Sequence, residues 1–109
     1  MQDKKQLQAL LQVLNQVFDM ERKLEQNGGN RSLERNLRRI KQSFEQLGLQ
    51  YHNPIGENYR ETRTDCEATI SGNSLNNLTI TEVIKPIIRL EIEGFSQIVQ
   101  RAVVIVEGR

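Results

Sequence analysis

The sequence predicts an α+β chain in which two helices come first and a small, mostly antiparallel β-domain follows. Up to Leu47 the apolar residues recur at steps of three and four, the period of a helix packed on one side. In the second half, short β-branched runs alternate with turn residues, a pattern typical of strands. Gly48 and Pro54 lie between these regions, and both residue types stop helices. We therefore expect a helical domain over residues 1–48 and a β-domain over residues 49–109.

The first predicted helix covers residues 3–26 and has a broad apolar face, with Asp3 and Gln6 spaced as a cap at its start. Turn residues at 27–30 end it, so the second helix, 31–47, should return antiparallel. Its apolar residues form a heptad seam. Two such hairpins packed face to face would make a four-helix bundle, so we expect a homodimer. The predicted dimer contacts are the apolar positions Leu7, Leu11, Leu14, Phe18, Leu33, Leu37, Ile40, Phe44 and Leu47.

Four short strands are predicted in the second half, at residues 65–70, 78–84, 87–92 and 98–106. Pro86 separates the second strand from the third, because proline cannot donate to a ladder. Glu93 and Gly94 should form a turn or bulge before the last strand. In the junction with the helices, Gly56 is expected to let the backbone turn where a side chain would clash.

Composition sets limits on the function. The chain has 109 residues, of which 37% are hydrophobic and 5% aromatic, so sharing a core with a second copy would help it to fold. The net charge is +1, so no bulk field recruits nucleic acid or a membrane surface. No uninterrupted apolar run predicts a signal peptide or a membrane span. Cys66 is the only cysteine, which favours a reducing compartment and a cytoplasmic location.

Residues capable of catalysis do not form a convergent set. His52 is the only histidine, so we expect no metal site. A nucleophilic pair of His52 and Cys66 is disfavoured, because the charges of Asp65 and Glu67 oppose a thiolate. These two acids are better explained as an exposed strand face than as an acid–base pair. Cys66 is better explained as a structural residue than as a nucleophile. Gly28-Gly29 lacks the strand and the Lys-Ser/Thr of a phosphate loop. We expect neither enzymatic activity nor a cofactor.

A basic run marks the second helix, and it has three interpretations. A solvated helix face is the simplest one. Nucleic acid could bind such a run, although the balanced overall charge and the interrupting acids argue against it. An acidic protein partner is the third. The run consists of Arg31, Arg35, Arg38, Arg39 and Lys41.

Five stretches together resemble a known family in their order and spacing. They are Val13 to Leu24, Phe44 to Leu49, Pro54 to Tyr59, Ile80 to Pro86, and Gln100 to Val106. The chain is similar along nearly all of its length to the GrpE family of nucleotide exchange factors. Members of that family serve DnaK-type chaperones in protein folding and the stress response. No single stretch is highly specific, and the resemblance depends on the whole order.

The resemblance implies a homodimer with a four-helix bundle and a small β-domain on each side. One β-domain would bind the nucleotide-binding domain of a DnaK-type chaperone and speed ADP release. The implied partner contacts are the turn Pro54, Ile55, Gly56 and Glu57, with Tyr59, Lys85, Pro86 and Arg101 as further positions. The family's long N-terminal helix has no counterpart here, so the resemblance is to a short form.

Three departures from the family pattern keep a second interpretation open. Tyr59-Arg60-Glu61 stands where the family usually has Phe-Asp-Pro, and Gln100-Arg101-Ala102 where it has Arg-Pro-Ala. The family's Gly-Tyr in the preceding hairpin has no clear match. The alternative is therefore a dimeric adaptor of the GrpE fold that binds a different protein without exchange activity. An enzyme is the third and least favoured class.

Overall fold

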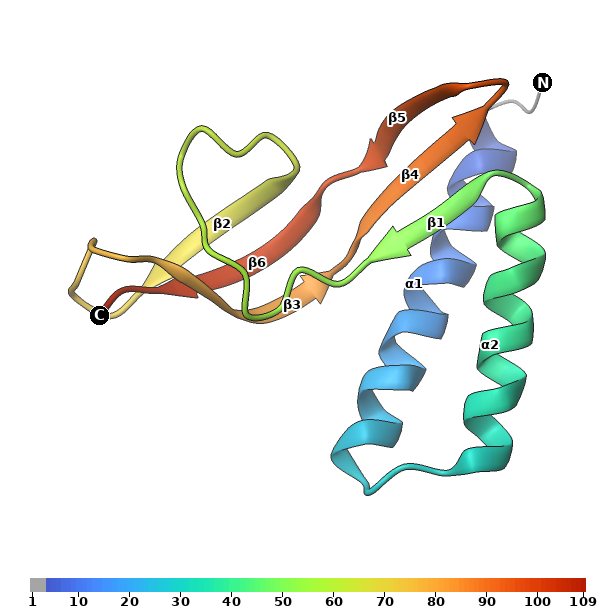
Figure 1. Cartoon of the computed structure of the whole chain (residues 1–109), viewed down its shortest axis with the longest axis horizontal. Helices are drawn as coiled ribbons and strands as arrows, with labels where there is room; N and C mark the ends of the chain where they lie inside the picture. The colour runs from blue at the N-terminus through green and yellow to red at the C-terminus, as the bar shows by residue number, and fades with distance from the viewer. Residues whose placement is uncertain (1–3) are drawn as a thin grey trace. The chain divides into compact units, whose positions relative to one another are not determined.

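The computed structural model describes residues 4–109 (Figure 1). Its elements are α1 (Lys4–Gln26), α2 (Arg31–Gln46), β1 (Leu49–His52), β2 (Cys66–Ser71), β3 (Thr79–Lys85), β4 (Ile87–Ile92), β5 (Phe95–Gln100) and β6 (Ala102–Glu107). The predicted α+β class, with helices first and a mostly antiparallel β part second, is confirmed. The chain divides after Gln50 into two compact units. We call residues 4–50 the helical unit and residues 51–109 the β unit, and describe each by itself.

The helical unit is an antiparallel pair of helices. An ion pair joins them, with Lys41 Nζ 2.8 Å from Glu21 Oε2. The apolar faces of the helices supply most of its buried side chains, which are Leu14, Val17 and Phe18 of α1 and Leu37 and Phe44 of α2. Leu49, which follows α2, is also buried. The cap predicted at Asp3 lies outside the described residues.

Local hydrogen bonds explain where α2 begins and ends. Asn30 Oδ1 accepts a hydrogen bond from the backbone N–H of Leu33 at 3.1 Å. Glu34 Oε2 in turn accepts one from the N–H of Asn30 at 3.2 Å, so side chains occupy two donors that the helix itself leaves free. At the other end Gly48 has a φ of +88°, the left-handed conformation predicted for it.

The six strands form two sheets, in the orders β1-β4-β5 and β2-β6-β3. β4 pairs with β5 and β3 with β6 in antiparallel fashion, whereas β2 runs parallel to β6. Lys85 of β3 pairs with Val103 of β6, and Ile88 of β4 pairs with Gln100 of β5. The same two stretches of chain therefore stay paired from one sheet to the next. A single long hairpin therefore passes from one sheet into the other, as Figure 1 shows.

Both strands of this hairpin are interrupted between the sheets. Pro86 separates β3 from β4, as predicted, because it has no N–H to donate. Arg101 separates β5 from β6, so the single strand predicted at 98–106 is wrong and is in fact two. The Gln100 side chain donates from Nε2 to the backbone oxygen of Pro86 at 2.9 Å and joins the two interruptions.

One face of the β2-β6-β3 sheet provides much of the core of the β unit. The parallel register sets alternate residues of β2 beside alternate residues of β6, so these side chains share a face. The buried residues of the whole unit are Pro54, Cys66, Ile80, Val83, Pro86, Ile87, Ile88, Ala102, Val104 and Val106. Residues 53–65 connect β1 to β2 and pair with β3 through a bridge between Asn58 and Thr79.

Candidate functional site

The predicted binding turn is fixed to a neighbouring strand by its main chain. The N–H of Glu57 donates to the backbone oxygen of Pro54 at 3.1 Å, and Gly56 has the positive φ, +81°, that a type II turn requires. The N–H of Gly56 donates to Ile80 O at 2.8 Å, and the N–H of Ile80 donates to Glu57 O at 2.9 Å. The turn is therefore fixed to β3 through Gly56 and Glu57.

This turn presents one apolar side chain and one bare stretch of backbone. Ile55 is 49% exposed, and its N–H is held by Asn53 Oδ1 at 3.1 Å. Pro54 is buried, so it shapes the turn and offers little surface to a partner. A Cβ added to Gly56 would meet nothing within 4 Å, so the expected clash inside the chain is wrong. The positive φ is what favours glycine here.

Glu57 begins a series of charged groups between the turn and β2. Its Oε2 lies 2.5 Å from His52 Nε2, and its Oε1 lies 2.7 Å from Arg63 Nη2. Arg63 also donates from Nε to Asp65 Oδ1 at 2.6 Å and from Nη1 to the backbone oxygen of Asn58 at 3.0 Å. The side chains of Arg63 and Asp65 are only 20% and 19% exposed. One arginine thus fastens three points of the connecting segment.

These contacts lower the pKa of both carboxyl groups. Burial alone would raise the pKa of Glu57 and of Asp65, but the hydrogen bonds and positive charge of Arg63 outweigh it. The neighbouring Cys66 is different, since burial raises the pKa of its thiol to about 11 against a smaller lowering by Arg63. The thiol is therefore protonated at neutral pH and is a poor nucleophile.

The other predicted contacts lie where the long hairpin is interrupted. Lys85 is exposed, whereas Pro86 is buried. Arg101 uses its guanidinium within its own chain, donating to the backbone oxygens of Thr64 at 3.1 Å and Cys66 at 2.8 Å. Its Nη1 also donates to Glu67 Oε1 of β2 at 3.2 Å. Arg101 thus fastens the start of β2 to the hairpin, and contact with a partner stays a prediction for all three residues.

Tyr59 lines a hollow of about 520 Å³ at one end of the β unit. Its N–H donates to the backbone oxygen of Leu78 at 2.9 Å and continues the pairing of this segment beside β3. Ile70 and Leu75 also line the hollow, and both are exposed. Tyr59, one of the predicted contact residues, therefore lies at a concave surface.

The residues predicted to form the dimer interface fall into three groups in the single chain. Four are buried already, namely Leu14, Phe18, Leu37 and Phe44. Two are half-buried, Leu7 and Leu11. Three are exposed, Leu33, Ile40 and Leu47. Their role in a dimer stays a prediction. The three exposed residues are the ones still available to contact a second copy.

The exposed apolar residues of the helical unit form two stripes. Within each stripe the residues are seven apart, which keeps them on one side of a helix. Helical spacing also places both stripes on the side of the helix pair away from Glu21 and Lys41. We call this surface the apolar helix face; its residues are 38% to 51% exposed and are Val13, Met20, Leu33, Ile40 and Leu47.

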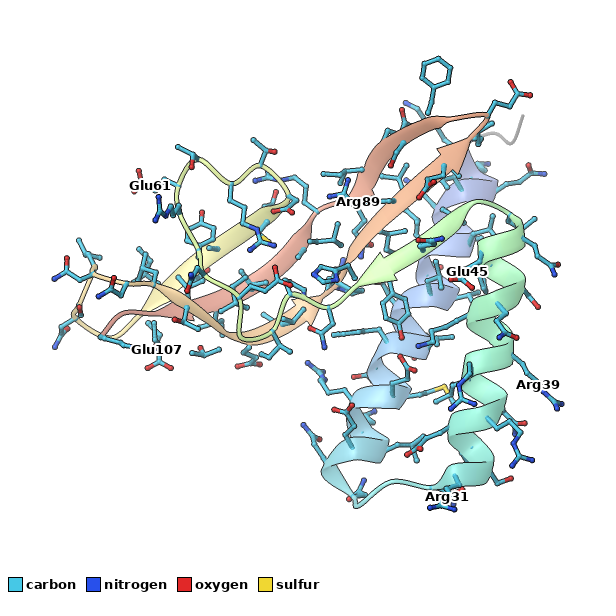
Figure 2. The ribbon with its side chains drawn as sticks, in the orientation of Figure 1. Arg31, Arg39, Glu45, Glu61, Arg89 and Glu107 are labelled. Atoms are coloured by element: carbon cyan, nitrogen blue, oxygen red, sulfur yellow. The ribbon has the colours of Figure 1, made fainter. Side chains whose placement is uncertain are left out.

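The basic run of α2 is divided between two roles. Lys41 is paired with Glu21, as described above. The four arginines of the run are exposed. Figure 2 shows the side chains of Arg31 and Arg39 extending away from α2. This placement agrees with a solvated helix face.

His52 contacts Glu57, and no hydrogen bond within residues 4–109 joins it to the buried Cys66. No group of three or more His, Cys, Asp or Glu side chains in that range could hold a metal ion. No helix in the described part of the chain is both long and apolar enough to cross a membrane.

No known family description, curated protein or solved structure matches this chain. Two residues of the β unit were not predicted from the sequence. Arg63 is the first, and its signal is the order Glu57, Arg63, Asp65, an acid on each side of one base in a loop. Leu75 is the second, a large apolar residue in a turn of small polar ones.

Proposed function

We propose that this protein is a GrpE-like co-chaperone, a homodimer that binds the nucleotide-binding domain of a DnaK-type chaperone and promotes ADP release. The observation that carries the proposal is the turn Pro54–Glu57. It has the proline, glycine and glutamate that the family resemblance requires, and it presents Ile55 and an unobstructed Gly56 on a fixed backbone. A fixed turn loses little conformational entropy when it docks against another protein.

The proposed activity needs no chemical step. A β unit that binds the open form of the chaperone's nucleotide cleft more tightly than the closed form shifts the population toward the open form. ADP then leaves faster. Full burial of the exposed half of Ile55 would contribute about 1 kcal/mol, roughly a fivefold preference. Further contacts must supply the remaining preference for the open form. The exposed Lys85 is the first candidate for such a contact.

The apolar helix face supports the dimer. Single exposed apolar residues are common on protein surfaces, but five large ones gathered on one side of a two-helix unit are typical of an interaction surface. Packing two copies through this face would bury them in a four-helix core. Each copy would then carry its own β unit.

The test is an ADP-release assay. A DnaK-type chaperone loaded with a fluorescent ADP analogue is mixed with this protein, and the release rate is followed in a stopped-flow instrument. Wild type should raise the rate. Ile55→Ser should lower the stimulation about fivefold, because it removes the exposed apolar group that would contact the chaperone. Gly56→Asn should also lower it, since asparagine tolerates a positive φ and adds a side chain to the docking surface.

Phe95→Ser is the matched control. Phe95 is 80% exposed beside the tip of the β4–β5 hairpin, outside the turn, so its loss should leave the stimulation unchanged. Melting temperatures of all three variants should stay close to that of wild type. A folded Ile55→Ser protein with full stimulation would contradict the proposed role of the turn.

An adaptor without exchange activity is the second candidate. Arg101 favours it, because its guanidinium is occupied by the protein's own backbone. The same assay separates the two. If wild type is dimeric but neither binds the chaperone nor changes ADP release, the adaptor is favoured and the co-chaperone is refuted.

A further inference from the structure

The edge strand β2 is covered at its beginning and exposed at its end. Cys66 and Ile70 lie on the same face of β2, four residues apart, and pair with Ala102 and Val106 of β6. Cys66 is 1% exposed, whereas Ile70 is 43% exposed. The connecting segment therefore covers the beginning of β2 and leaves its end bare. The hollow of about 520 Å³ lies at this uncovered end.

Leu75 stands at the edge of the hollow on a loop that is firmly held. The loop is fixed to the C-terminal segment, with Ser74 Oγ donating to Arg109 O at 2.8 Å and the N–H of Arg109 donating to Asn76 O at 2.9 Å. Gly108 packs so closely that an added Cβ would lie 2.4 Å from the backbone oxygen of Ser74. Leu75 itself is 69% exposed. A rigid loop thus displays a large apolar side chain.

Three charged side chains stand around the hollow. Arg60, Glu61 and Arg109 line it, and in residues 4–109 no ion pair involves any of the three side chains. Figure 2 shows Glu61 on the segment that leads to β2. Two arginines and one glutamate thus stand beside the apolar side chains of Ile70, Leu75 and Leu78, in a hollow that exposes both polar and apolar surface. Guanidinium groups without an ion pair favour a ligand that carries a carboxylate.

We propose that this hollow, formed by Tyr59, Ile70, Leu75 and Leu78 with Arg60 and Arg109, binds an apolar side chain of a partner protein that has acidic residues beside it. The volume lies within the range of about 300–1,000 Å³ typical of ligand pockets, enough for one or two large side chains. Leu75 and Ile70 supply apolar contact, and the arginines pair with the neighbouring carboxylates. The inference does not depend on the chaperone proposal, because the turn Pro54–Glu57 does not line the hollow.

A labelled peptide tests this inference directly. The probe is a short Gly-Ser peptide with a central Phe-Leu flanked by aspartates, and its binding to the full chain is followed by fluorescence anisotropy. Two matched peptides replace the aspartates with lysine or the Phe-Leu with Ala-Ala. Only the peptide with both Phe-Leu and aspartates should bind. Its affinity should fall as salt is raised from about 50 to about 200 mM, because salt screens the attraction between charges. No binding of the first peptide, or equal binding of the lysine peptide, would overturn the proposal.

Variants of the protein locate the site. Leu75→Ser should weaken binding about tenfold, since it removes most of the exposed apolar contact. Arg60→Gln and Arg109→Gln should each weaken binding and reduce its salt dependence. Phe95→Ser is the control for an exposed apolar residue elsewhere on the unit and should bind as wild type does. Wild-type affinity in a folded Leu75→Ser protein, or an equal loss in Phe95→Ser, would refute the assignment.

Discussion

Arg63→Met tests whether the charged groups between the turn and β2 stabilise the β unit. Methionine keeps most of the side chain's apolar stem but removes the guanidinium. The variant loses the ion pairs with Glu57 and Asp65 and the hydrogen bond to the backbone of Asn58. It leaves Glu57 with only its contact to His52, and the partly buried Asp65 with only the more distant Arg89, at 4.0 Å.

The size of the effect follows from the exposure of each partner. A hydrogen bond to a charged group is worth about 1.5–3 kcal/mol, and the well-shielded pair with Asp65 should lie in that range. The Glu57 side chain is 36% exposed, so its pair is screened by water and worth about 0–1 kcal/mol. The bond to Asn58 adds about 0.5–1.5 kcal/mol. Because one side chain makes all three, we expect a total loss of about 2–4 kcal/mol in the free energy of unfolding.

Denaturant unfolding at several pH values provides the measurement. The folded-state pKa values of Glu57 and Asp65 are lowered, so the stability they supply is complete above the unfolded pKa of about 4 and is lost as pH falls through the folded values. The gap between wild type and Arg63→Met should therefore be largest near neutral pH and narrow below about pH 5. Arg60→Met, at an exposed arginine of the same segment, is the control and should change stability by no more than about 0.5 kcal/mol. A gap below about 0.5 kcal/mol at pH 7, or one that widens in acid, would refute the reasoning.

Three further predictions concern the helices and the cysteine. Ile40→Glu places a charge on the apolar helix face and should shift the protein from dimer to monomer in sedimentation, whereas Gln42→Glu adds the same charge outside that face and should not. A wild type that sediments as a folded monomer at high concentration would contradict the dimer. The Cys66 thiol should react with a thiol reagent at pH 8 only after unfolding, because it is buried and its pKa is about 11. Cys66→Ala should cost about 1–2 kcal/mol of stability and leave partner binding intact, and loss of binding in the folded variant would show a direct role.

Local signals in the sequence predicted the order of the elements well. The helical period, Gly48 after α2 and Pro86 between two strands each depend on the residue itself and its close neighbours. The turn at Glu93 and Gly94 is also correct, with both residues at positive φ as a two-residue hairpin requires. Such features need no knowledge of distant parts of the chain.

Features that depend on distant contacts were missed. The strand β1 has only four residues, too few to show a period, and lies in a stretch that we interpreted as a junction. The break between β5 and β6 at Arg101 depends on bonds to Thr64 and Cys66, far away in the sequence. The role of Arg63 likewise appears only when the chain turns back on itself. The candidate turn was found by resemblance, whereas the hollow beside Leu75 required the structure.

The long hairpin also bears on how the β unit folds. Its pairing starts at the tight turn of Glu93 and Gly94 and runs outward through both sheets, with small register shifts on the way. Each new pair therefore extends an existing ladder and closes no new large loop, which keeps the entropic barrier low. The parallel strand β2 is the opposite case, because it joins Cys66 to Ala102 across the whole hairpin. The hairpin can thus act as the template on which β2 docks late, and the arginines at 63 and 101 then fasten that last strand in place.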